Sequence, residues 1–179
     1  MTPSPIWTPA PARVASSRLA RFVEESSPFE FEGDMRALYR DLHRWSIRDP
    51  AAFWSAVADF CGLELNEQPE AVVEDYERMS GARWFRGAKL NYAENLLEFG
   101  RRDQAVVFVN ERGDRRELEI GEIKQQVAAV ARALKQAGVV RGDRVAAILP
   151  NTPECLIAAL ATASIGAVWS SCSPDFGRP

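Results

Sequence analysis

Residues 144–171 read RVAAILPNTPECLIAALATASIGAVWSS, and this stretch decides the fold. Residues 144–149 are apolar on both faces after Arg144, which is typical of a strand in a sheet covered on both sides. Pro150 ends that strand, Thr152-Pro153 begins a helix, and Gly166 ends the helix before a second strand at 167–171. A strand, a helix and a strand over this span predict a right-handed parallel crossover and hence an α/β fold.

The same alternation extends upstream to residue 104. A run of β-branched and aromatic residues at 105–109 predicts a strand, and a turn at 112–114 leads to a shorter strand at 117–120. The residues that follow predict an amphipathic helix closed by Gly138 in its C-cap position. Its apolar face carries Ile120, Ile123, Val127, Val130, Ala131 and Leu134.

The first half of the chain has helical periodicity instead. One apolar stripe predicts a helix and carries Met35, Leu38, Tyr39, Leu42 and Trp45. Asp49-Pro50 supplies an N-cap and a first-turn proline for a second helix, which Gly62 ends. The apolar face of that helix carries Phe53, Trp54, Val57, Ala58 and Cys61.

Three further segments complete this half. Residues 1–20 hold four prolines among small polar residues and predict an extended or disordered arm. Residues 64–80 are acidic, and we interpret them as a solvated connector in preference to a cation site, because no turn chemistry shapes such a site. Asn91 and Glu94 have the spacing of a capping box that opens a short helix closed by Gly100.

Composition excludes several classes of function. The 179 residues carry a net charge of -3, so binding to nucleic acid has no electrostatic support. The three cysteines are far apart in sequence, which favours reduced, small buried side chains over a disulfide framework. No apolar stretch reaches the ~20 residues that a bilayer needs, and no secretory signal is visible, so we expect a cytoplasmic chain without membrane anchorage.

Common catalytic motifs are absent from the sequence. No pair of glycines has the spacing of G-x-G-x-x-G or of G-x-x-x-x-G-K. His43 is the only histidine and no C-x-x-C occurs, so a zinc site and a histidine-dependent triad lack their residues. We expect His43 on the surface and Trp45 and Trp54 in the core, while Trp7 has no assigned role.

The loop at 170–177, SSCSPDFG, is the strongest candidate for contact with a ligand. Short hydroxylated side chains and a turn follow the carboxyl end of a parallel strand, where open α/β sheets bind ligands. An ordinary polar turn is an equally good interpretation of these residues. Spacing and composition alone therefore leave both interpretations of this loop open.

Several motifs resemble the acetyl-CoA synthetase group of adenylate-forming enzymes. WFRGAKLNYAENLL at 84–97 resembles the signature that closes the N-terminal region of this group. LEIGEIKQQV, GVVRGDRVAAILPNTPE and ATASIGAVWSS, which follow, resemble the opening motifs of its adenylate-forming domain. The resemblance covers residues 35–177 and implies a helical N-terminal region at 21–97 and an incomplete domain at 98–179, after the disordered arm expected at 1–20.

The ending WSSCSPDFG resembles the acetoacetyl-CoA synthetase branch, whereas acetyl- and propionyl-activating relatives usually have histidine after the valine and a Gly-Gly-Phe further on. The resemblance implies a ligase reaction in two steps. Acetoacetate attacks the α-phosphate of ATP to give an acyl-adenylate and diphosphate, and the coenzyme A thiol then displaces AMP. Mg²⁺ and a donor-rich loop would neutralise the phosphates, and alignment of the thiol with the acyl carbon would follow.

The family's phosphate loop, acyl pocket and catalytic lysine lie downstream of the matched motifs, so the resemblance assigns no catalytic or metal-ligating residue to this chain. It places Ser173, Pro174, Asp175 and Phe176 beside the coenzyme A channel. We expect the N-terminal part of a longer ligase that uses ATP, coenzyme A and Mg²⁺, with none of them bound tightly by these residues alone. A non-catalytic interaction module of the same origin and a piece of an acetyl- or propionyl-CoA synthetase remain open alternatives.

Overall fold

The computed structural model describes residues 6–29, 35–98 and 105–176, with the side chains of Met35, Arg36 and Ala105 left out. The chain divides into two compact units. The first comprises residues 1–63 and 67–88, and the second comprises residues 64–66 and 89–179. Each unit has a hydrophobic core of its own.

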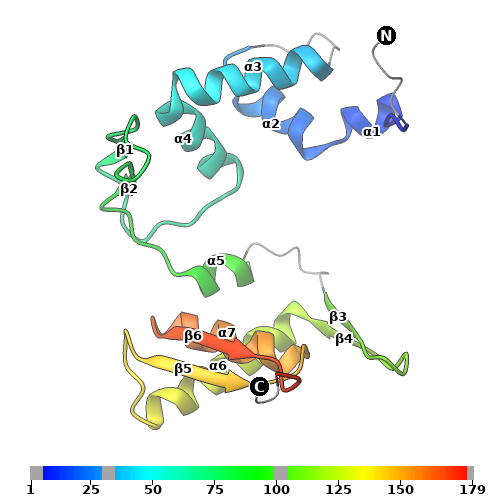
Figure 1. Cartoon of the computed structure of the whole chain (residues 1–179), viewed down its shortest axis with the longest axis vertical. Coiled ribbons are helices and arrows are strands. Elements are labelled where there is room, and N and C mark those ends of the chain that lie inside the picture. The colour runs from blue at the N-terminus through cyan, green and yellow to red at the C-terminus, as the bar shows by residue number, and fades with distance from the viewer. Residues whose placement is uncertain (1–5, 30–34, 99–104, 177–179) are drawn as a thin grey trace. The chain divides into compact units, whose positions relative to one another are not determined.

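The first unit is mainly helical, with α1 (Pro11–Ala15), α2 (Arg18–Ser26), α3 (Met35–Arg48) and α4 (Pro50–Phe60) (Figure 1). The prediction of an extended or disordered arm is wrong from Pro11 onward. Pro11 stands in the first turn of α1, where its missing N–H has no helical partner to lose. Ser17 caps α2 by accepting the N–H of Ala20 at 3.1 Å. Residues 1–5 lie outside the described ranges.

Aromatic rings surround the buried core of the first unit. Phe22, Val23, Leu38 and Leu42 are the buried residues of this core. The ring of Trp45 lies 6.1 Å from that of Phe22 and 5.1 Å from that of Phe53, which confirms Trp45 as a packing residue. Tyr39, predicted on the same stripe, is instead 68% exposed. Trp54 is 41% exposed and so lies at the edge of the cluster, with its ring 5.8 Å from that of Trp84.

A hairpin follows α4 in the segment that the sequence predicted to be a solvated connector. Strand β1 (Ala71–Glu74) pairs antiparallel with β2 (Arg83–Arg86). Glu74 bonds two arginines of the opposite strand, Arg86 at 2.8 Å and Arg83 at 3.0 Å. The carboxylates are thus paired across the hairpin, and no group of three or more acidic, histidine or cysteine side chains able to hold a metal ion occurs within the described ranges.

The second unit contains the predicted strand and helix alternation. Its elements are α5 (Tyr92–Glu98), β3 (Ala105–Val109), β4 (Arg115–Glu119), α6 (Ile120–Gln136), β5 (Arg144–Ile148), α7 (Pro153–Ser164) and β6 (Val168–Cys172) (Figure 1). Strands β3 and β4 form an antiparallel hairpin, with β4 starting two residues before its predicted position. Strands β5 and β6 are parallel, in the register that pairs Arg144 with Val168 and Ile148 with Cys172, so the crossover is confirmed.

Helices α6 and α7 bury the core of this unit together with α5 and β4. The buried residues are Ala93, Leu118, Ile123, Val127, Ile157, Leu160 and Ala161. Gly138, at a φ of 89°, ends α6 as predicted, because a left-handed residue suits glycine. None of the helices in the part of the chain that the structure describes is long and apolar enough to cross a bilayer.

The prediction that the parallel sheet is covered on both faces is wrong for the described residues. Side chains along β5 alternate between exposed and half-buried. Ile148 is 70% exposed and Val168 is 54% exposed, and both lie on the same face with Ala146 and Cys172. Exposure of apolar side chains on one face means that the helices of the described chain cover only the other.

Candidate functional site

The candidate loop begins where two parallel strands end together. Ile148 and Cys172 pair at the carboxyl ends of β5 and β6, and the N–H of Leu149 donates to the carbonyl oxygen of Cys172 at 3.2 Å. Ser173 follows immediately. The loop therefore lies at the carboxyl edge of the sheet, which is the position where open α/β sheets bind ligands.

The loop itself is a tight turn that bonds its own polar groups. The hydroxyl of Ser173 accepts the N–H of Asp175 at 3.2 Å and donates to Asp175 Oδ2 at 2.9 Å. The N–H of Phe176 donates to the carbonyl oxygen of Ser173 at 3.3 Å. Phe176 is 79% exposed, while Pro174 and Asp175 are also exposed. The turn thus offers a free aromatic ring and one carboxylate to a ligand, and its hydroxyl is already bonded.

The turn that precedes β6 leads the chain from α7 into this strand, at the end of the strand opposite the loop. Gly166 has a φ of 74° and its carbonyl oxygen accepts the N–H of Gly142 at 3.0 Å. The N–H of Val168 donates to the carbonyl oxygen of Asp143 at 2.7 Å. A Cβ at position 166 would lie 3.0 Å from Cγ of Arg141, so both the conformation and the available space favour glycine there.

The first turn of α7 lies at the same edge of the sheet and holds the ion pair between Glu154 and Arg116 of β4, at 2.9 Å. The Thr152 hydroxyl, the backbone N–H of Glu154 itself and the Arg116 guanidinium together hold the pKa of Glu154 below its usual value. Glu154 is therefore ionised at neutral pH. Its side chain is exposed to solvent. Such a carboxylate serves as an ion-pair partner and is poorly suited to donate a proton.

The structure also places the other chemically distinctive residues that the sequence contains. His43 is exposed on α3, as the sequence predicted. Trp7 is 67% exposed and its ring lies 6.0 Å from the guanidinium of Arg13. Cys61 and Cys155 are half-buried free thiols, but Cys172 is exposed. The prediction of a buried side chain is wrong for Cys172, because it lies on the uncovered face of the sheet.

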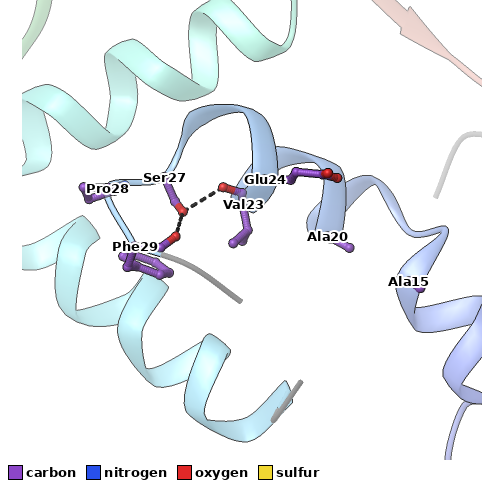
Figure 2. Close-up of a pocket in the computed structure, with 7 residues that line it drawn as sticks. All are labelled: Ala15, Ala20, Val23, Glu24, Ser27, Pro28 and Phe29. Atoms are coloured by element: carbon purple, nitrogen blue, oxygen red, sulfur yellow. Dashed lines mark hydrogen bonds between the residues drawn. The ribbon is translucent and has the colours of Figure 1, made fainter. Parts of the chain in front are cut away.

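A hollow of about 610 Å³ lies beside α2, and the hydroxyl in its lining is already bonded. Figure 2 shows the Ser27 hydroxyl between two carbonyl oxygens, those of Val23 at 2.7 Å and Phe29 at 2.6 Å. Apart from Ser27 and Glu24, the lining is apolar. The described residues around this hollow include no basic side chain that could pair with a phosphate.

Within the described ranges, no group of three or more acidic, histidine or cysteine side chains is arranged to hold a metal ion. The glycines of the sequence also lack the spacing of a phosphate-binding loop. The exposed ring of Phe176 is an apolar surface that the candidate loop offers to a ligand.

Two family models match the chain, one after the other. The model described as "Acetyl-coenzyme A synthetase N-terminus" matches residues 39–96. The model described as "AMP-binding enzyme" matches residues 96–179. The second match includes the parallel crossover and the candidate loop, and the first includes α4, the hairpin and most of α5.

Two curated proteins and one solved structure are similar to this chain. An acetoacetyl-coenzyme A synthetase of Rhizobium meliloti is 41% identical over 174 residues, which is 97% of this chain and 26% of that protein. A malonamoyl-CoA synthetase of Penicillium aethiopicum is 38% identical over 147 residues, which is 78% of this chain and 20% of that protein. The solved structure of acetoacetyl-CoA synthetase from Streptomyces lividans superimposes with a TM-score of 0.86 at 39% identity, over 98% of this chain and 27% of that one. This chain therefore spans about a quarter of the length of its relatives.

Proposed function

We propose that the chain belongs to the AMP-binding enzymes of the acetyl-coenzyme A synthetase type, whose models match residues 39–96 and 96–179, and that it forms the N-terminal part of an acetoacetate–CoA ligase. The observation that carries this proposal is the match of 97% of the chain to one quarter of an acetoacetyl-coenzyme A synthetase. The fold agrees with the acetoacetyl-CoA synthetase structure at a TM-score of 0.86.

The substrate that we propose is acetoacetate. The names of the relatives include both acetoacetyl- and malonamoyl-CoA synthetases. Acetoacetate and malonamate are short carboxylates of similar size with a second carbonyl group on the β-carbon. We therefore assign this chain's ligase to short β-carbonyl carboxylates, with acetoacetate favoured by the higher identity, 41% against 38%.

The chain's own contribution is a scaffold and one contact surface. The parallel strands β5 and β6 form the beginning of the sheet of the AMP-binding domain. The helices α6 and α7 belong to the same domain. The loop from Ser173 to Phe176 lines the coenzyme A channel, with the exposed ring of Phe176 available to pack against the cofactor. ATP with Mg²⁺, when bound, would supply the adenylyl group that activates the carboxylate.

The remaining parts of the proposal follow from the sequence. Residues 21–97 form an N-terminal region and residues 98–179 begin the AMP-binding domain, and a small molecule is the substrate. The net charge of -3 does not favour a nucleic-acid partner. Cysteines without a disulfide among the described residues suit a reducing compartment, so we place the ligase in the cytoplasm.

The test compares two preparations of the protein. The first is the complete product of the gene that encodes this sequence, and the second is the chain of 179 residues. Each is incubated with acetoacetate, ATP, Mg²⁺ and coenzyme A, and AMP and acetoacetyl-CoA are quantified by chromatography. We expect the complete protein to form both products in equal amounts and the shorter chain to form neither.

Three outcomes contradict the proposal. Turnover of acetate without turnover of acetoacetate overturns the substrate assignment. AMP release by the purified chain of 179 residues overturns the statement that its residues alone cannot hold the nucleotide. A complete protein that binds neither ATP nor coenzyme A would indicate a non-catalytic interaction module.

A further inference from the structure

The side chain of Asn91 bonds three backbone groups in two helices. Its Oδ1 atom accepts the N–H of Ala93 at 3.0 Å and the N–H of Glu94 at 3.3 Å. Its Nδ2 atom donates to the carbonyl oxygen of Ser164 at 2.9 Å. Because a backbone N–H only donates and a carbonyl oxygen only accepts, these partners fix the orientation of the amide. One side chain thus caps the start of α5 and the end of α7.

The bond to Ser164 acts where α7 turns into β6. Ser164 is the last residue of α7, and the final carbonyl groups of a helix have no partner within it. The next residues are the turn at Gly166 and the first residue of β6, Val168. The bond therefore ties α5 to the end of α7 that leads into β6, across 73 positions of sequence, and the candidate loop follows at the far end of that strand.

Packing places Asn91 firmly against α7. Ala93, two residues later, has no exposed surface and lies in the core cluster with Leu160 and Ala161 of α7. Helix α5 is also bonded to the backbone of Glu64. The side-chain amide of Asn95 donates to the carbonyl oxygen of Glu64 and accepts its N–H, each at 2.9 Å. Helix α5 is thus fixed by packing and by two asparagine side chains, and only Asn91 reaches α7 among the bonds described here.

We propose that Asn91 is a positioning residue, whose amide holds the turn from α7 into β6 and thereby, through the placement of β6 beside β5, sets the position of the loop from Ser173 to Phe176. The effect on coenzyme A rests on the proposed function of that loop, while the effect on the turn does not. Aspartate and serine are N-caps as good as asparagine. Neither side chain has an N–H that could donate to the carbonyl oxygen of Ser164. The side-chain amide is therefore needed for the bond to α7 and not for the cap of α5.

The first experiment uses the chain of 179 residues and measures amide hydrogen exchange in Asn91→Asp and Asn91→Ser. Each variant keeps the cap on α5 and loses the bond to Ser164. We expect the amide hydrogens of Ala167 and Val168 to exchange about five- to tenfold faster, the effect of one lost hydrogen bond, while those of α6 are unchanged. Asn91→Ser adds no charge and so serves if the aspartate variant folds poorly.

Asn95→Asp is the matched control, because it makes the same chemical change one turn later in α5 and leaves the bond to Ser164 in place. We expect it to leave the exchange of Ala167 within a factor of about two. The proposal is overturned if Asn91→Asp also stays within that range, or if both variants accelerate exchange at Ala167 equally.

The second experiment uses the complete protein and separates this inference from the proposed function. In Asn91→Ser we expect the KM for coenzyme A to rise about tenfold, while the KM for ATP and acetoacetate-dependent exchange between ATP and diphosphate stay at wild-type values. Equal losses in every parameter would indicate a purely structural role and refute the positioning of the loop. A wild-type protein without acetoacetate activation refutes the proposed function, and the exchange measurement still decides the role of Asn91 at the turn.

Discussion

Replacement of Leu118 by alanine tests whether the second unit has a core of its own. Leu118 lies on β4 and is only 2% exposed, in one cluster with residues of α5, α6 and α7. The cluster that contains Phe22 of α2 shares no residue with it. A cavity at position 118 should therefore weaken the second unit and leave the first unit unchanged.

The magnitude follows from the burial of the side chain. Truncation of a buried leucine to alanine costs about 2–5 kcal/mol, because transfer free energy is lost and a cavity remains. With a denaturant dependence of ~1–3 kcal/mol per molar urea, a loss of ~3 kcal/mol lowers the unfolding midpoint of the second unit by ~1–3 M. Leu96→Ala is the control, since Leu96 is 45% exposed and its truncation should cost less than about 1 kcal/mol.

Fluorine NMR of protein labelled with 5-fluorotryptophan reports on each unit separately. Of the five tryptophans, only Trp169 lies in the second unit. Its resonance is assigned by Trp169→Phe and followed through a urea titration beside the resonance of Trp45. In Leu118→Ala we expect the Trp169 transition to move to lower urea and the Trp45 transition to stay in place, and in Phe22→Ala the reverse.

Two results would refute this reasoning. If the Trp169 and Trp45 transitions move together in Leu118→Ala, the two cores do not unfold separately. If Leu118→Ala costs no more than Leu96→Ala, the side chain at 118 is not buried in a packed core.

Three further predictions concern single residues. Asp49→Ala should lower the free energy of unfolding of the first unit by about 1 kcal/mol and Asp49→Asn should be nearly neutral, since Asp49 caps α4 through its side chain; urea titration measures both. The pKa of Glu154 lies below its usual value, so its contribution to stability is present above the unfolded pKa and is lost as pH falls through the folded one; Thr152→Val should raise that pKa toward its usual value in a carboxyl NMR titration. Gly138→Ala should destabilise α6 by about 1 kcal/mol because of its φ of 89°, whereas Gly121→Ala, at a helical position with open space around it, should not destabilise; thermal unfolding compares the pair.

The sequence predicts the second unit well because its signals are local and agree with one another. Three local features each determine the boundary of a strand or helix through backbone chemistry alone. They are the apolar run at 144–149, the helix start at Thr152-Pro153 and the glycine at 166. The uncovered sheet face could not be predicted this way. The apolar residues of a strand indicate that both of its faces tend to be buried. Whether each face is buried in the folded chain depends on whether neighbouring elements cover it.

The hairpin β1–β2 escapes prediction for a different reason. Acidic residues from Glu70 to Asp75 are typical of a solvated loop until their partners are known. In the structure, Arg83 and Arg86 lie across the hairpin and bond Glu74, and Phe85 between them has a φ of 46° that no local pattern indicates. Cross-strand pairing between distant positions stabilises this element, and periodicity does not detect such pairs.

The candidate loop was located from sequence, but the residues that support it were not. The chain pattern places Ser173 at the carboxyl end of a parallel strand, and the structure agrees. The bond between Asn91 and Ser164 spans 73 positions, and the pair between Arg116 and Glu154 spans 38. The capping spacing predicts that the side-chain oxygen of Asn91 accepts backbone N–H groups at the start of α5. The bond that the side-chain nitrogen donates to Ser164 is evident only in the folded chain.

The most direct test of the account measures kcat/KM of the complete protein for acetoacetate, malonamate, acetate and propionate, with ATP, Mg²⁺ and coenzyme A held constant. The account predicts that the β-carbonyl acids are activated, with acetoacetate first, and that acetate and propionate are poorer by at least about tenfold. A preference for acetate or propionate over both β-carbonyl acids would contradict it.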